Sequence, residues 1–105
     1  LKSASIRTVA MVVMEAPNVL RDEITTTVVP LMLDALQTSK ANTVDVRRAA
    51  LETLALVPEK YDIGVLHSVR HTILKVLTKA RDDHKRLVRL DAVRGYNKWL
   101  NFGDV

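Results

Sequence analysis

The chain has 105 residues, of which 48% are hydrophobic and 27% are charged, and its formal net charge is +4. That apolar fraction supports a packed core and excludes an intrinsically disordered chain. Three glycines and three prolines are too few for a turn-rich β-sandwich or barrel, and the lack of cysteine excludes disulfide scaffolds and thiolate metal centres. No apolar run is long enough for a membrane span. The chain begins with Leu rather than Met, and we expect a fragment cut within a structural unit.

The apolar residues follow a helical period over nearly the whole chain. Pro30 is expected to kink the second of the predicted helices, because proline removes a donor and clashes with the preceding turn. Asn42 or Thr43 is a suitable N-cap for the third. In chain order, the period predicts helices over residues 3–16, 19–37, 44–57, 65–81 and 85–101.

Breaks between these helices coincide with residues that favour turns. Residues 38–43 form a polar break, and Pro58 and Gly64 are expected to bracket a short connection. Asp82 and Asp83 are expected to make the next turn and cap the last helix, which Gly103 ends.

The first, third and fifth predicted helices resemble one another. Each opens with an aliphatic residue followed by Arg, and Ala follows four residues after the aliphatic one. The starts are 40 and 42 residues apart, which is the period of HEAT and armadillo arrays. The matching segments are Ile6-Arg7 with Ala10, Val46-Arg47 with Ala50, and Val88-Arg89 with Ala92.

This recurrence predicts an all-α fold, namely a HEAT-type α-solenoid of about five helices in antiparallel pairs. The 105 residues are then one domain, with a half repeat at its cut N-terminal edge. We expect the half repeat over 1–17, a repeat over 18–58 and a terminal repeat over 62–103.

The repeated Arg residues have a structural explanation. In HEAT arrays such an Arg pairs with an Asp in the turn just upstream or in the next unit, and Asp83 lies six residues before Arg89. We therefore expect structural roles for Arg7, Arg47 and Arg89.

The search for catalytic and metal-binding motifs finds none. There is no glycine-rich phosphate loop, and the acidic pairs lie near helix starts, where the helix dipole favours them. His67 and His71 have a chelating spacing, but no further acid or His lies on that face, so a solvated helix face is the favoured interpretation. We predict no enzyme activity, no catalytic residues, no cofactor and no metal site.

Basic residues concentrate near the C-terminus. Residues 70–98 hold nine Lys or Arg and three Asp, a net charge of +6. On the last helix, the 100° period places Val88, Ala92, Gly95 and Trp99 on one face, with Trp99 expected in the core. The opposite face carries cations around one leucine, which is typical of a docking surface because Arg forms forked bonds to carboxylates. The predicted partner-binding residues are Arg86, Leu90, Arg94, Asn97 and Lys98.

One segment resembles a known family. Residues Asp82-Asp83-His84-Lys85-Arg86-Leu87-Val88-Arg89, Asp91-Ala92-Val93 and Lys98-Trp99 are similar to the terminal repeat of the large HEAT-repeat adaptor of cytosolic iron–sulfur protein assembly. That family was first noticed through sensitivity to methyl methanesulfonate and is linked to nucleotide-excision repair. The specific match covers about residues 72–100, and the rest agrees only as HEAT-type helices.

The resemblance implies a non-enzymatic adaptor of the cytoplasm and nucleus. It implies docking to a small hook-like subunit and a WD-repeat propeller, for cluster delivery to apoproteins of DNA replication, repair and transcription. The lack of cysteine agrees with a scaffold that does not ligate the cluster.

Two alternatives stay open at this point. A basic HEAT domain could bind nucleic acid, although the cations concentrate at one end. The docking site could instead lie on the outward faces of the third and fourth helices, around Arg48, Glu52, Arg70 and Lys75.

Overall fold

The computed structural model describes residues 2–37 and 42–102, and within these ranges all regular structure is helical, with no strand. This confirms the all-α prediction. A 3₁₀ segment, η1 (Pro17–Glu23), and a π-helical segment, η2 (Ile24–Val28), precede the second α-helix. The α-helices are α1 (Lys2–Glu15), α2 (Val29–Ala35), α3 (Val44–Lys60), α4 (Ile63–Ala80) and α5 (Arg86–Asn101).

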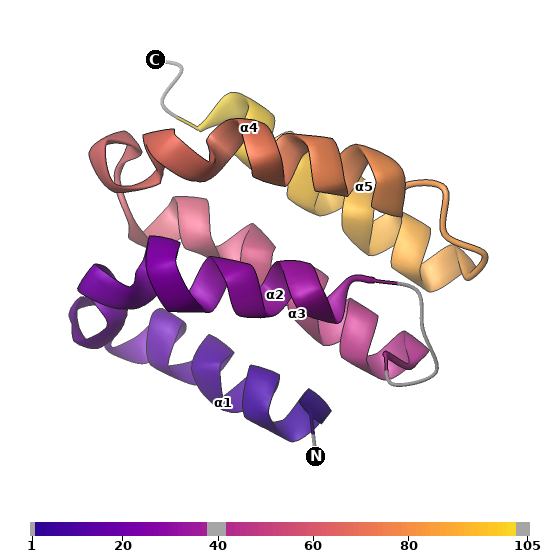
Figure 1. Ribbon diagram of the computed structural model, residues 1–105, viewed down its shortest axis with the longest axis horizontal. Coiled ribbons are helices and arrows are strands. Elements are labelled where there is room, and N and C mark those ends of the chain that lie inside the picture. Colours follow the sequence, from indigo (N-terminus) through magenta and orange to yellow (C-terminus); the bar gives the residue numbers. More distant parts are fainter. Residues whose placement is uncertain (1, 38–41, 103–105) are drawn as a thin grey trace.

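The helices form two layers. Helix α3 packs between α1 and α5 in one layer, while α2 packs on α3 and α4 packs on α5 in the other (Figure 1). The helices of the first layer run in the same direction, and α2 and α4 run back the opposite way (Figure 1). The thinnest dimension is 19 Å, which fits two layers of helices packed about 8–10 Å apart. No described helix has the length and apolar character needed to cross a membrane.

The segment before α2 differs from the single kinked helix predicted over 19–37. The path is helical, but it changes from a 3₁₀ to a π and then to an α geometry. The N–H of Val29 donates to the carbonyl of Ile24, five residues earlier. Pro30 explains this widened turn, because its ring would clash with the carbonyl four residues before it and it has no N–H to donate. The distortion therefore precedes Pro30 and is not confined to it.

Helix α3 continues through a proline at which it was predicted to end. It runs to Lys60 with Pro58 inside it. Because Pro58 has no N–H, the carbonyl of Leu54 loses its partner within the helix. The indole Nε1 of Trp99 donates to that carbonyl at 2.7 Å. The hydrogen bond lost to the proline is thus replaced by one from α5.

Two helix starts also refine the predictions. Thr43 is the N-cap of α3, since its side chain accepts a hydrogen bond from the N–H of Val46, whereas Asn42 donates to two carbonyls at the end of the α2 segment. Helix α4 begins at Ile63, earlier than predicted, because the side chain of Asp62 accepts from the N–H of Val65. Gly64 accordingly lies in the first turn of α4 and not in a connection.

The start of α5 lacks the predicted acidic cap. Lys85 occupies the N-cap position, and no side chain caps the helix there. The carboxylate of Asp83 accepts from the N–H of Lys85, but it lies before the cap position and is shared with another helix, as described below. The predicted terminator Gly103 and most of the polar break, residues 38–41, lie outside the described residues.

The core contains the residues that the repeat predicts. Ile6, Val46 and Val88, the aliphatic residues of the three matching starts, are buried. On α5 the predicted inner face of Val88, Ala92, Gly95 and Trp99 is buried, and Trp99 is completely enclosed. The expectation that Trp99 belongs to the core is confirmed.

Trp99→Ala is expected to reduce the free energy of unfolding by about 3–5 kcal/mol, because it leaves a large cavity. Trp99→Phe keeps most of the volume but leaves the carbonyl of Leu54 without a donor, and it should cost about 1–3 kcal/mol. Urea unfolding followed by circular dichroism measures both changes. Met11→Ala, at a side chain 60% exposed, is the control and should stay within about 0.5 kcal/mol. A Trp99→Phe variant as stable as the wild type would contradict a role for the indole hydrogen bond.

Gly95→Ala is expected to stabilise the protein. A Cβ at this position would lie 3.6 Å from Leu77, an ordinary van der Waals distance, so the new methyl group fits. Alanine in the interior of a helix is favoured over glycine by about 0.5–1 kcal/mol. Thermal unfolding should show a higher Tm, and a lower Tm would mean that the contact between α4 and α5 is tighter than the structure indicates.

Candidate protein-interaction surface

Ion pairs join the three helices of the first layer. Arg7 of α1 reaches Asp45 of α3 at 3.1 Å, where both side chains are more than half exposed. Arg48 of α3 reaches the buried Asp91 of α5 at 2.9 Å. Lys98 of α5 pairs with Glu59 of α3 at 3.0 Å. Consecutive helices of this layer are therefore tied by charge as well as by apolar packing.

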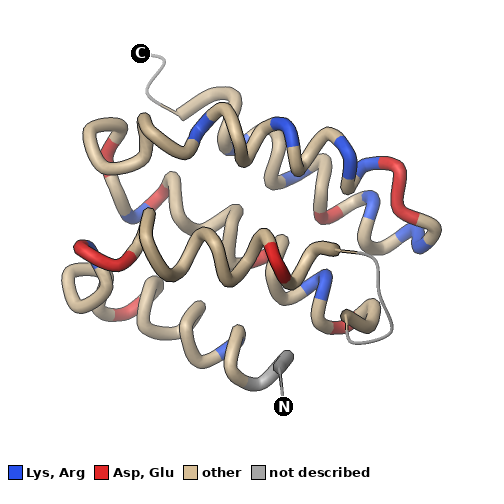
Figure 2. The backbone as a smooth tube through the Cα atoms, in the orientation of Figure 1, with Lys and Arg blue, Asp and Glu red and all other residues tan. Residues whose placement is uncertain are grey.

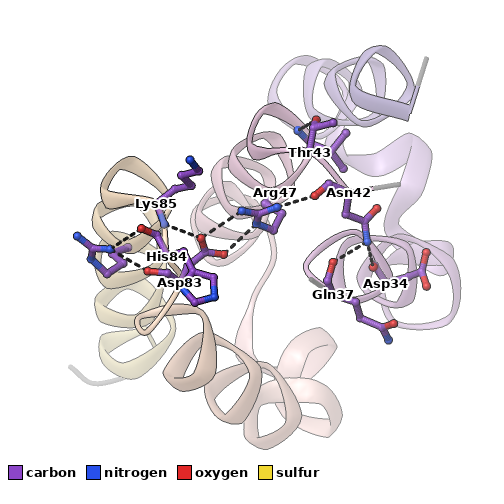
Figure 3. A network of polar contacts seen from close by, with 10 residues as sticks. Asp34, Gln37, Asn42, Thr43, Arg47, Asp83, His84 and Lys85 are labelled. Carbon is purple, nitrogen blue, oxygen red and sulfur yellow. Dashed lines mark hydrogen bonds and ion pairs between the residues drawn. The ribbon is translucent and has the colours of Figure 1, made fainter. Parts of the chain in front are cut away.

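The most buried of these pairs joins Arg47 to Asp83. The guanidinium donates to both carboxylate oxygens, from Nε at 2.9 Å and from Nη2 at 3.2 Å, and Nη1 donates to the carbonyl of Asn42 (Figure 3). The two side chains are 9% and 7% exposed. Such a forked and buried pair fixes the turn before α5 against the start of α3.

The environment of Asp83 changes its acidity. Burial alone would raise the pKa of its carboxyl, but the hydrogen bonds from Arg47 and from the N–H of Lys85 outweigh burial and hold that pKa below its usual value. The carboxylate is therefore ionised over the whole neutral range, and its stabilising effect is present at neutral pH.

Arg89 has a different set of partners from the one predicted for it. Asp83, six residues upstream, gives its carboxylate to Arg47, and Arg89 instead donates from Nη1 to the backbone carbonyls of Asp83 and His84. The reason is geometric: the carboxylate of Asp83 faces α3, where it already accepts two hydrogen bonds from Arg47. A structural role for Arg7 and Arg47 agrees with their ion pairs across helices.

The five predicted partner-binding residues all lie exposed on α5. Figure 2 shows Lys and Arg concentrated along α4 and α5. Arg86 and Arg94 have no ion-pair partner among the described residues, and Leu90 is 50% exposed. Asn97 shares this outer face. Lys98 differs from the others, because it lies on the flank and is paired with Glu59.

Sequence reasoning missed three apolar residues of the same helix. Leu87, Val93 and Leu100 are 48%, 43% and 42% exposed, so α5 presents more apolar surface than Leu90 alone. The signal was present in the spacing, since positions separated by alternating steps of four and three residues share one stripe of a helix. That stripe consists of Arg86, Leu90, Val93, Asn97 and Leu100, and Leu87 lies outside it.

Other cations of the basic segment are engaged with aromatic rings. The guanidinium of Arg81 lies 4.3 Å from the ring centre of Tyr96. Arg70 lies 4.8 Å from that of Phe102 and also donates to the carbonyl of Leu100 at 2.6 Å. These contacts join α4 and its C-cap residue Arg81 to α5 and its C-cap residue Phe102, since cations bind favourably over aromatic faces.

The alternative site on α3 and α4 is less available. Two of its four residues, Arg48 and Arg70, are already bound to α5, whereas Glu52 and Lys75 are exposed. His67 and His71 are exposed on α4, and the described residues contain no group of three potential metal ligands.

Comparison with protein-family models and with curated proteins finds no match for this chain.

Asp83→Asn is expected to cost about 3–5 kcal/mol near neutral pH, because it leaves Arg47 buried without its counter-charge. The folded pKa of Asp83 lies below the unfolded value of about 3.9, so the folded state binds the proton more weakly. The advantage of the wild type over Asp83→Asn should therefore be constant above about pH 5 and shrink as the pH falls through the folded pKa. Urea unfolding over a series of pH values measures it.

The matched control for this prediction is Asp45→Asn, which breaks the exposed pair to Arg7. Its carboxylate is 66% exposed, so the loss should be less than about 1 kcal/mol. Equal losses for the two variants would show that burial of the Arg47–Asp83 pair is unimportant.

Proposed function

We propose that this chain is a non-enzymatic adaptor domain of the HEAT type that binds other proteins. The two-layer stack, the 40- and 42-residue spacing of its first-layer helices and the ion pairs between them support this assignment. In such arrays each unit contacts mainly its neighbours, and the remaining faces are free to bind partners.

The observation that carries the proposal is the outer face of α5. It combines exposed leucines with Arg86 and Arg94, which have no ion-pair partner in the part of the chain that the structure describes. Its one acid, Asp91, is buried and bound to Arg48. Exposed apolar groups among cations of one sign form a surface for a partner with apolar and acidic groups. The partner-binding residues proposed are Arg86, Leu90, Arg94, Asn97 and Lys98.

The resemblance of residues 72–100 supports a more particular assignment. In it, the domain docks the small hook-like subunit and the WD-repeat propeller of the cytosolic iron–sulfur targeting complex. The complex delivers clusters to apoproteins of DNA replication, repair and transcription, in the cytoplasm and nucleus. The domain itself carries no cluster in this proposal.

Binding of nucleic acid is the second candidate function, favoured by the +6 charge of residues 70–98. Several of these cations have partners within the protein: Arg81 lies over Tyr96, Arg70 over Phe102, and Lys98 against Glu59. A salt titration separates the candidates, because affinity for phosphates falls steeply with salt, whereas an interface with an apolar centre loses less.

The double variant Arg86→Glu with Arg94→Glu is expected to abolish capture of the purified targeting subunits. Truncation of a hot-spot Arg typically costs about 2 kcal/mol, and reversal of two charges repels an acidic partner further. The measurement is a pull-down with each subunit, together with a circular dichroism melt that should be nearly unchanged.

The control is Lys75→Glu with Lys79→Glu, which changes the net charge equally on exposed positions of α4. It should capture the subunits at the wild-type level. If instead the α5 variant binds normally and the α4 variant does not, the docking site lies on the third and fourth helices.

A further inference from the structure

The outer face of α5 repeats the face of α3 that α5 covers. When Val46 is aligned with Val88, the residues Arg47, Arg48 and Leu51 of α3 correspond to Arg89, Leu90 and Val93 of α5. On α3 these residues meet the next helix: Arg47 binds Asp83, Arg48 binds Asp91, and the Leu51 carbonyl lies close to Gly95. The equivalent positions on α5 have no helix beside them within the described chain.

Arg89 is held in the same way as Arg47 but lacks its carboxylate. Nη1 of each arginine donates to the carbonyl five residues upstream, Asn42 for Arg47 and His84 for Arg89. Arg47 uses its remaining fork, Nε and Nη2, to bind Asp83. The described residues provide no partner for Nε and Nη2 of Arg89, and this side chain is partly exposed. The guanidinium of Arg89 is thus oriented by the turn before α5, and its Nε and Nη2 can bind a carboxylate.

Apolar groups follow Arg89 along the same face. Leu90, Val93 and Leu100 are 42–50% exposed, whereas Leu51, the counterpart of Val93, is fully buried. Their spacing of three and seven residues gives a seam like that of a coiled coil, which another helix can fill with apolar side chains at matching positions.

We propose that this face binds an amphipathic helix of a partner protein, laid beside α5 as α5 is laid beside α3. The partner helix presents apolar residues to Leu90, Val93 and Leu100, and a carboxylate just before its first turn binds the fork of Arg89 as Asp83 binds that of Arg47. This inference rests on the proposed adaptor function and specifies the chemistry of the partner.

Charge argues for a partner of this kind rather than for a second copy of the chain. Arg86 shares the stripe of the seam, the exposed Arg94 lies one turn after Leu90, and the sole acid of α5 is buried. Two such faces would bring cations against cations, whereas acidic residues flanking the seam of the partner helix would pair with them.

The probe is a synthetic helical peptide with Leu at heptad positions a and d, Glu at e and g, and Asp immediately before the first turn. Its own Glu side chains keep it from self-pairing near neutral pH. Fluorescence anisotropy measures its Kd for the 105-residue chain, and we expect binding to this peptide but not to the same peptide with Lys at e and g. Absence of binding to both peptides overturns the proposal.

Two sets of variants test where the peptide lies. Val93→Ser with Leu100→Ser should weaken binding about tenfold or more, since both side chains are exposed and their loss should not unfold the chain. The matched control, Met11→Ser with Val19→Ser, removes two apolar side chains of greater exposure from α1 and η1 and should leave the Kd unchanged. Equal effects of the two double variants, or no effect of the α5 variant, overturn the proposal.

A double-mutant cycle tests the role assigned to Arg89. Arg89→Lys keeps the charge but not the fork, and it is measured against peptides with Asp or Asn before the first turn. We expect about a tenfold loss from either change and little further loss from the two together. Additive losses would show that the two groups do not meet.

The peptide experiment and the pull-down test the helical partner and the adaptor function separately. If the acidic peptide fails to bind while Arg86→Glu with Arg94→Glu still abolishes capture of the targeting subunits, the adaptor function stands and the helical partner is wrong. Sedimentation of the unliganded chain tests whether a second copy of the chain binds this face. A dimer that dissociates in the double variant Val93→Ser with Leu100→Ser would assign the face to self-association and overturn the proposal.

Discussion

The buried pair of Arg47 and Asp83 determines where α5 lies on α3. Its two hydrogen bonds and low exposure make it directional, unlike the exposed pair of Arg7 and Asp45. The cost of removing both charges from water is offset only in this geometry, so a shift of α5 along α3 would leave two buried charges unpaired. The far end of α5 is held by a second specific contact, the bond from Trp99 to Leu54. One helix is thereby fixed at both ends, and its outer face acquires a definite orientation.

The bond from Trp99 depends on a residue that sequence reasoning read as a helix terminator. Pro58 does not end α3, and the carbonyl of Leu54, which the proline deprives of a donor, receives another from α5. The substitute donor lies 45 residues away in the sequence. No local rule of helix formation contains that information. The widened turn before Pro30 differs in this respect, because the clash of the proline ring with the preceding turn is a local effect.

Much of the fold was nonetheless predictable from periodicity. Burial of Val88, Ala92, Gly95 and Trp99 on one face follows from the 100° period alone. The sequence offered Asn42 or Thr43 as the cap of α3, and only the structure decides for Thr43. The partner of Asp83 was not predictable, because two arginines of equal chemistry compete for it and only the tertiary structure decides between them. The candidate site was found through its charges, which are local in sequence. Its apolar part was overlooked because Val93 and Leu100 look like core residues until the neighbouring helices are in place.

The features that let α3 receive α5, namely an oriented arginine and aliphatic side chains at successive turns, recur on α5, where none of the described helices lies beside them. The outer face of α5 is not purely polar, because Leu90, Val93 and Leu100 form an exposed apolar seam on it. In the complex that we propose, Arg86 and Arg94 would repel a partner helix that carries cations at the facing positions. In that complex, charge would select the partner, and apolar contact would supply the affinity. The Arg89 fork, oriented by its own turn, would fix the position at which the carboxylate of the partner helix binds.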